Sequence, residues 1–271
     1  MSWEVYAAKY ADRNARTRAD SFIFDDNHDA PHAMDYFIWV LRQGDRVILV
    51  DTGYDAEEAK RRNRPIRSDP REALTPLGIS AEDIDTVIVT HLHYDHAGGL
   101  ALFPNATLHL QAAEMAYATG PCMCHKTLRD PFTAGHIGEA IQRLYSGRVV
   151  FYKGAGEVAP GVEVRCIGGH SRGLQAVRVQ TEAGWMCLAS DAAHYYENFL
   201  LEKPFPIVVD LQDMLDGFAT IQRLASAPGL VIPGHDPLVR QVFPEWKSHS
   251  GLWRLDQGPS QDPLNLIDSV S

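Results

Sequence analysis

The stretch Thr90-His91-Leu92-His93-Tyr94-Asp95-His96-Ala97-Gly98-Gly99 decides how the rest of the chain is interpreted. It places three histidines and one aspartate within a few positions, directly after the apolar run 84–90, which is typical of a buried strand. Imidazole nitrogens and carboxylate oxygens are the usual ligands of zinc and similar ions. We therefore interpret the stretch as a metal-binding turn that leaves a strand. The alternative, a chance cluster of surface histidines, explains neither the strand nor the spacing.

The order of side chains within this turn predicts two neighbouring groups of ligands. His91 and His93 can point to one side of the turn, while Asp95 and His96 reach a neighbouring point. The two glycines at the end of the stretch would let the following helix approach closely.

Working outward, apolar and β-branched runs predict strands on both sides of the motif. The predicted strands are 3–10, 34–41, 46–50, 84–90, 107–110, 149–151, 162–166, 174–179, 185–189 and 230–232. The predicted helices are 56–62, 111–118 and 211–225, and the stretch 121–146 is interpreted as helical and irregular. Two strand-rich halves with helices between the strands indicate stacked sheets whose outer faces are covered by helices.

Composition and charge exclude several classes of protein. The chain has 25 Lys plus Arg and 35 Asp plus Glu, a net charge of −10, so nucleic acid and anionic membrane surfaces are not expected partners. The first residues do not resemble a secretory signal, and no apolar run approaches the roughly 18 residues of a membrane helix. The cysteines, Cys122, Cys124, Cys166 and Cys187, do not form a disulfide-rich pattern, which favours a cytoplasmic location with reduced thiols.

The motif His91-x-His93-x-Asp95-His96 is that of the metallo-β-lactamase superfamily, which this sequence resembles. Further blocks of that family have counterparts here in the expected order: Asp51-Thr52-Gly53, Gly168-Gly169-His170-Ser171-Arg172-Gly173, Leu188-Ala189-Ser190-Asp191 and Pro233-Gly234-His235-Asp236. The resemblance implies an α/β (α+β) fold, the αββα sandwich of two mixed β-sheets flanked by helices. It also implies a single hydrolase domain over residues 1–271, with a metal centre at one edge of the sheets.

Carried over position by position, the resemblance implies two divalent metal ions, with Zn²⁺ as the favoured ion. One ion would be held by His91, His93 and His170, and the other by Asp95, His96 and His235. Asp191 would bridge the two ions, and Asp51 would orient a ligand histidine through its free ring nitrogen. Two such ions share a water and lower its pKa, so a bridging hydroxide can attack an ester carbonyl.

Within the superfamily, the chain resembles the N-acyl homoserine lactonase branch. The supporting features are the loop before the predicted strand 34–41 and the short tail after His235. The bridging Asp191, in place of a cysteine, disfavours antibiotic hydrolysis. The resemblance thus implies a small-molecule substrate, an N-acyl homoserine lactone or related γ-lactone, with a quorum-quenching role, and it suggests a homodimer.

The sequence departs from that branch next to the bridging aspartate. The branch places a tyrosine three residues after it, whereas this chain has His194, followed by Tyr195 and Tyr196. We hypothesise that His194 or Tyr195 is a catalytic electrophile or acid. In the alternative, Tyr195 and Tyr196 pack beneath the site. A second departure is Gly168, at a position where proline is commoner in that branch.

Other functions remain open at this point. A hydrolase of the same fold could act on another ester, a thioester or a carbamate. An iron persulfide dioxygenase would use a similar histidine motif. A non-catalytic binding module is disfavoured, because no position of the motif has been lost.

Several residues outside the motif have two interpretations. The loops 20–33, 60–70 and 120–135 are expected to shape the substrate pocket. The arginines of the second loop, Arg62, Arg64 and Arg67, are most simply solvated, but they could attract an anionic substrate.

His28 and His32 are expected to be exposed loop residues, with substrate contact as the alternative. Cys122-Met123-Cys124-His125 lacks the second pair of ligands that a zinc site needs, so packing or a place in the pocket wall is expected for it.

Overall fold

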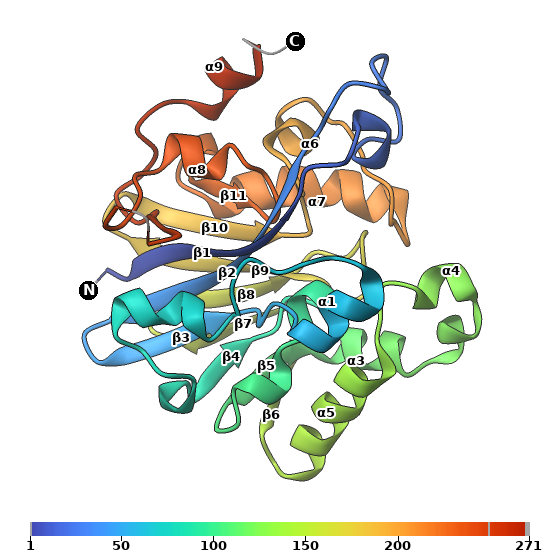
Figure 1. Cartoon of the computed structure of the whole chain (residues 1–271), viewed down its shortest axis with the longest axis vertical. Helices are drawn as coiled ribbons and strands as arrows, with labels where there is room; N and C mark the ends of the chain where they lie inside the picture. The colour runs from blue at the N-terminus through green and yellow to red at the C-terminus, as the bar shows by residue number, and fades with distance from the viewer. Residues whose placement is uncertain (1, 249, 269–271) are drawn as a thin grey trace.

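The computed structural model describes residues 2–248 and 250–268, and within them the strands form two stacked sheets (Figure 1). The first sheet has seven strands, in the spatial order β12 (Leu252–Arg254), β1 (Glu4–Arg13), β2 (Met34–Gln43), β3 (Arg46–Val50), β4 (Thr86–Ile88), β5 (Thr107–Gln111) and β6 (Val149–Tyr152). The second has five, in the order β11 (Val231–Pro233), β10 (Gly184–Ser190), β9 (Gln175–Thr181), β8 (Val162–Cys166) and β7 (Ala155–Ala159).

Both sheets are mixed. In the first sheet β3, β4, β5 and β6 run parallel and the remaining neighbours are antiparallel, while in the second only β10 and β11 are parallel. The carboxyl ends of β3 and β4 therefore meet at one edge of the first sheet, and those of β10 and β11 meet at one edge of the second. These two edges carry the candidate site.

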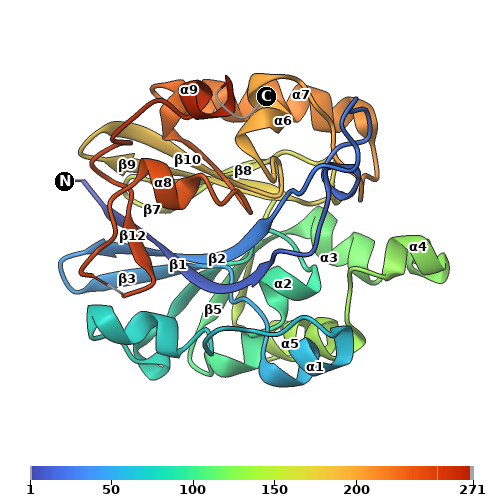
Figure 2. The ribbon, with the colours of Figure 1, turned by 45° about the horizontal axis from the view of Figure 1, so that its top comes forward.

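Helices cover the outer faces of both sheets. They are α1 (Ala56–Arg62), α2 (Tyr94–Ala97), α3 (Ala112–Ala118), α4 (Lys126–Arg129), α5 (Ala134–Tyr145), α6 (Tyr196–Leu200), α7 (Leu211–Leu224), α8 (Val239–Val242) and α9 (Pro263–Asp268). In Figure 2, α6, α7 and α9 lie above the five-stranded sheet, and α1 and α5 lie below the seven-stranded one. The predicted αββα sandwich is confirmed. Within the described ranges, no helix is long and apolar enough to span a membrane.

The alternation of side chains along β2 shows why its sequence is a continuous apolar run. Phe37, Trp39 and Leu41 belong to the core between the sheets, where they pack with residues of β8, β9 and β10. Tyr36 and Ile38 point the other way, into the core beneath the helices of the first sheet. A strand buried on both faces has no solvated side, and its sequence therefore lacks the polar alternation of a surface strand.

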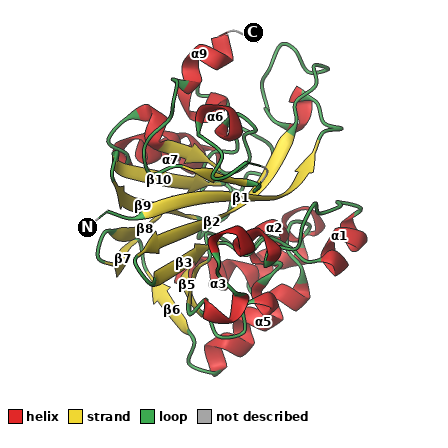
Figure 3. Ribbon diagram, turned by 60° about the vertical axis from the view of Figure 1, so that its left-hand side comes forward, coloured by secondary structure: helices red, strands yellow, loops and turns green. Residues whose placement is uncertain are grey.

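Most predicted elements are confirmed within a few residues, and the differences have local causes. β1 and β2 are longer than predicted, and Figure 3 shows this pair running beyond the body of the sheets into the loop that joins them. The run 84–90 pairs as a strand only over Thr86–Ile88, because the chain then turns into the histidine motif. β7 and β12 were not predicted, since one is glycine-containing and the other has three residues.

The glycines that end the motif allow two backbones to touch. A Cβ on Gly99 would lie 2.3 Å from the carbonyl oxygen of Thr52.

We expect Gly99→Ala to lower the free energy of unfolding by about 1–3 kcal/mol, since the backbone must move to admit the methyl group. The matched control is Gly138→Ala in α5, where nothing lies within 4 Å. This change should raise stability by about 0.5–1 kcal/mol through higher helix propensity. Denaturant unfolding measures both, and equal effects of the two variants would contradict the close approach.

Candidate metal centre

Asp51 ties the ends of β3 and β4 together. It follows Val50 of β3 with φ +60°, and its main-chain N–H donates to Ile88 of β4 over 2.9 Å. Its carboxylate accepts hydrogen bonds of 2.7 Å from both the main-chain N–H and the hydroxyl of Thr90. The same carboxylate lies 2.7 Å from His96 Nδ1, so it holds the turn and orients one of its histidines. Asp51 is fully buried.

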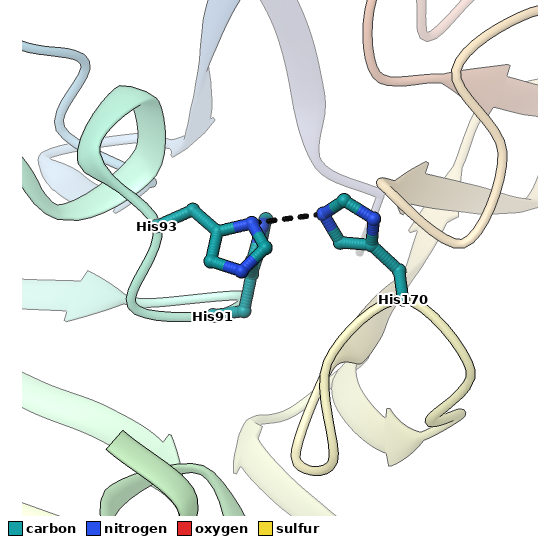
Figure 4. A group of neighbouring side chains, drawn as sticks. All are labelled: His91, His93 and His170. Carbon is teal, nitrogen blue, oxygen red and sulfur yellow. Dashed lines mark hydrogen bonds between the residues drawn. The ribbon is translucent and has the colours of Figure 1, made fainter. Parts of the chain in front are cut away.

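Three histidines form the first group of candidate ligands. His91, His93 and His170 present ring nitrogens within 4.8 Å of one another, and His170 Nε2 lies 2.9 Å from His93 Nδ1 (Figure 4). His170 comes from the loop between β8 and β9, opposite the turn that carries His91 and His93. Burial, reinforced by the neighbouring imidazoles, holds the pKa of His91 and His93 well below the usual value, so both rings are neutral and able to coordinate.

Asp95, His96 and His235 form the second group, again with all ligand atoms within 4.8 Å. The Nε2 atoms of His96 and His235 lie 4.0 Å and 3.9 Å from carboxylate oxygens of Asp95. Burial opposes protonation of His96, but the facing carboxylates of Asp191, Asp51 and Asp95 together raise its pKa well above the usual value in the metal-free protein. A divalent cation would take the place of that proton.

Asp191 lies between the two groups. Its Oδ1 is 3.2 Å from His96 Nε2 and 3.0 Å from His235 Nε2. Its Oδ2 is 3.2 Å from His170 Nε2 and 3.8 Å from His91 Nε2. Burial opposes ionisation of Asp191, but the surrounding imidazoles hold its pKa well below the usual value. One carboxylate oxygen thus faces each group, which is the arrangement that a bridging ligand requires.

Main-chain carbonyls orient two of these histidines. Nδ1 of His170 lies 2.7 Å from the carbonyl oxygen of Ile207, and Nδ1 of His235 lies 2.8 Å from that of Asp35. A carbonyl only accepts, so each Nδ1 carries a proton, which leaves Nε2 as the nitrogen that can bind a metal ion. Both Nε2 atoms face the Asp191 carboxylate.

The hydrogen bonding of the cluster is incomplete without cations. His91 Nε2, His96 Nε2 and Asp191 Oδ1 are buried and have no hydrogen-bond partner among the described residues. Leaving buried polar atoms unpaired is costly, whereas divalent ions bound by this set of nitrogens and oxygens would pair all three. The residues therefore fit two divalent metal ions.

His194 and Tyr195, the two candidate catalytic residues after Asp191, have different partners in the structure. His194 Nε2 lies 3.0 Å from Asp191 Oδ2, and its ring stacks on Phe205 at 3.8 Å. The Tyr195 hydroxyl instead accepts from Arg16 over 2.9 Å and donates to the carbonyl of Ala33 over 3.3 Å. Tyr196 is buried in the core between sheet and helices. Of the three, only His194 joins a cluster of candidate ligand atoms.

A cavity of about 70 Å³ opens over the centre, and a larger one of about 560 Å³ adjoins it, sharing His93, Pro131, His170 and Ile207 in its walls. The larger cavity is otherwise lined by Tyr117, Lys126, Thr127, Leu128, Asp130, Val208 and Val209. The loop 120–135 lines both cavities, and the loops 20–33 and 60–70 line the smaller one through Asp20 and Arg64. The segment 206–209 also lines the cavities, and it was missed because nothing in its sequence marks it.

The remaining residues singled out by the sequence lie elsewhere or have structural partners. Cys122 and Cys124 are exposed, so the expected packing or wall role is wrong for both. His32 contacts Ser21 and Glu197, while His28 is exposed. Arg64 lines the smaller cavity, whereas Arg62 and Arg67 do not.

Sequence comparisons find known proteins that are similar to this chain. Residues 34–240 match the model of the metallo-beta-lactamase superfamily. An N-acyl homoserine lactonase of Bacillus cereus is 30% identical over 230 residues, which cover 77% of this chain and 85% of the relative. A probable metallo-hydrolase of Mycobacterium tuberculosis is 24% identical over 238 residues, 76% of each chain.

Solved structures show the same fold. A quorum-quenching N-acyl homoserine lactone lactonase superposes with a TM-score of 0.70 at 23% identity, covering 89% of this chain and 94% of that one. A hydrolase in the beta-lactamase superfamily reaches 0.73 at 17% identity, with coverage of 96% and 95%. A dizinc quorum-quenching lactonase in complex with a product reaches 0.69 at 15% identity, with coverage of 96% and 94%.

Proposed function

Because this chain belongs to the metallo-beta-lactamase superfamily, we propose that it is a metal-dependent hydrolase that opens a lactone ring at a centre of two divalent cations. The observation that carries the proposal is the position of Asp191, with one oxygen toward each group of histidines. The likeness to a lactonase over most of both chains supports a lactone as the substrate, and an N-acyl homoserine lactone is the first to test.

The proposed ligands are the residues of the two groups. His91, His93 and His170 would hold one cation, and Asp95, His96 and His235 the other, with Asp191 shared between them. Two bound divalent ions would polarise the ester carbonyl and supply hydroxide near neutral pH. Nitrogen and carboxylate ligands of this kind favour Zn²⁺.

The chain's own residues would orient the ligands and the substrate. Asp51 and the carbonyls of Asp35 and Ile207 hold three ligand rings in place, each through the nitrogen that faces away from the centre. The larger cavity, with Leu128 and Val209 in its walls, offers apolar surface for an acyl group while the ring lies at the centre.

His194 would act on the substrate from the side of Asp191. Burial lowers its pKa to about 3, and the rings of Phe205 and His170 fix its plane. A neutral imidazole at this point can donate a hydrogen bond to the carbonyl or to the leaving oxygen, as a phenol would. Tyr195 would position the loop through Arg16 and not contact the substrate.

A titration at constant pH tests the proposed function. The protein loaded with zinc is offered N-acyl homoserine lactones of several chain lengths, simple γ-lactones, an acyclic ester and a thioester, and acid release is followed. Release of one proton per lactone, in proportion to bound metal, is the expected result. Metal-loaded protein that opens no lactone but cleaves the thioester would replace the proposal with the neighbouring hydrolase class.

Two substitutions separate the roles of the aromatic pair. We expect His194→Ala to lower kcat for lactone opening about 10–100-fold, because a group that contacts the substrate is lost. Tyr195→Phe keeps the ring in place and should leave kcat within about threefold, since it removes only the hydrogen bonds of the hydroxyl with Arg16 and Ala33, away from the substrate. Steady-state kinetics at equal metal content measure both. Full turnover by both variants would remove His194 from the mechanism.

A further inference from the structure

Three arginines line the small cavity over the proposed metal centre. Arg13 ends β1, Arg16 follows it in the loop toward β2, and Arg64 lies in the loop after α1. The same cavity is lined by His93, Asp95, Asp191, His194 and His235. Segments far apart in the sequence thus bring three positive charges to one site.

Arg16 is a buried cation without an acidic partner. It is 7% exposed, and no carboxylate of a described residue lies within ion-pair distance of its guanidinium. Its Nη1 donates to Tyr195 and to the sulfur of Met34, and Nη2 donates to the carbonyl of Asp20. Its Nε has no partner among residues 2–248 and 250–268.

Arg143 shows how this chain buries an arginine for structural reasons. It is 3% exposed and forms an ion pair of 2.9 Å with Glu139. Its other nitrogens donate to three main-chain carbonyls, those of Leu100, Phe103 and Ala106. Burying a guanidinium without a negative partner is costly. Arg143 has such a partner and Arg16 does not, so we infer that a bound anion pairs with Arg16.

The other two arginines of the cavity are half-buried and also lack an acidic partner in the described part of the chain. Arg64 donates to the hydroxyl of Tyr94 and lies 5.0 Å from the centre of its ring. Arg13 makes no side-chain hydrogen bond with any described residue. Both guanidinium groups therefore retain donors for a ligand.

The carboxylates of the cavity are already engaged. Asp95 and Asp191 face the histidines and would neutralise bound cations. Asp20 accepts from the main-chain N–H of Thr17 over 3.0 Å. With the proposed ions in place, positive charge would exceed negative charge in this cavity, and an anion would be attracted to it.

We propose that Arg13, Arg16 and Arg64 form a subsite for a carboxylate of the substrate, in the cavity over the proposed metal centre and separate from the ester that is cleaved. The inference rests on the proposed function and adds to it a preference for a lactone that carries a carboxylate over the same lactone without one. Arginine suits this task because its fork of N–H donors matches the geometry of a carboxylate.

The first experiment compares γ-butyrolactone-γ-carboxylic acid with its primary amide, which has the same shape without the charge. The zinc-loaded wild-type protein should open the acid with a kcat/KM at least about tenfold higher. Arg16→Gln and Arg13→Gln should each remove most of that preference, which is measured as the ratio of the two kcat/KM values on the same metal-loaded preparation. Arg13→Gln guards against misfolding, since Arg13 has no side-chain hydrogen bond to lose. The control is Arg67→Gln, because Arg67 pairs with Asp12 outside the cavity and the preference should persist.

The second experiment measures binding without turnover. Calorimetric titration of the zinc-loaded protein compares glutarate with monomethyl glutarate, so each ligand has one carboxylate for the metal and only the diacid has a second. Tighter binding of the diacid, lost in Arg16→Gln and Arg13→Gln, supports the subsite even if no lactone is opened, in which case the proposed function alone fails. Equal binding of the two ligands, or equal kcat/KM for acid and amide while lactones are opened, overturns the subsite.

Discussion

Asp191→Asn is expected to lower kcat/KM for lactone opening by at least about a thousandfold. The carboxylate is the shared contact of both histidine groups, with imidazole nitrogens of His96, His170 and His235 within 3.2 Å. An amide has the same shape but no negative charge, and its NH₂ end cannot coordinate a cation. One of the two sites thus loses a ligand, and the cluster loses the charge that offsets two adjacent cations.

Metal analysis and kinetics on the same sample check this expectation. The variant should retain markedly less than the wild-type metal content after dialysis, and excess zinc should not restore full activity. The control is Asp216→Asn on the exposed face of α7, which should match the wild type in both respects. A variant that keeps both metals and its turnover would show that Asp191 bridges nothing.

Asp51→Asn is expected to weaken metal binding about 10–100-fold. Asp51 accepts from His96 Nδ1, from the Thr90 hydroxyl and from the Thr90 main-chain N–H. An amide NH₂ at the position of Oδ2 would face the Nδ1–H of His96, donor against donor. His96 would then favour the other tautomer, with its proton on the nitrogen that should bind the metal. Asparagine tolerates the positive φ of this position, so the backbone need not change.

Competition with a chelator measures the affinity, and denaturant unfolding of the metal-free protein measures the separate effect on the fold, about 1–3 kcal/mol. Asp55→Asn is the matched control, because Asp55 is the N-cap of α1 and asparagine caps equally well. If Asp51→Asn holds zinc as tightly as the control does, His96 is not oriented through this carboxylate.

The parts of the site that sequence could predict are those carried by short patterns. One strand is followed at fixed spacing by His91, His93, Asp95 and His96. In the structure the first two belong to one ligand group and the last two belong to the other. The gathering of His170, Asp191 and His235 around them relied on the family resemblance, since no local pattern relates loops so far apart.

What sequence could not predict depends on tertiary contacts. The carbonyls of Asp35 and Ile207 orient two rings, but a main-chain atom leaves no mark in the sequence. His194 and Tyr195 are neighbours whose side chains leave the backbone in different directions, so their different partners depend on the tertiary structure. No pattern in the sequence marks Arg13 or Arg16 as part of the cavity, because the end of β1 and the loop after it lie over a site whose ligands come from much later in the chain.

The candidate ligands come from both sheets: four follow β4 of the first, and His170, Asp191 and His235 follow strands of the second. Metal ions held by all of these ligands would cross-link the two sheets. Unfolding would then require the ions to dissociate, so the melting temperature would rise with the concentration of free metal ion. The amount of available metal would thereby also set the stability of the folded protein.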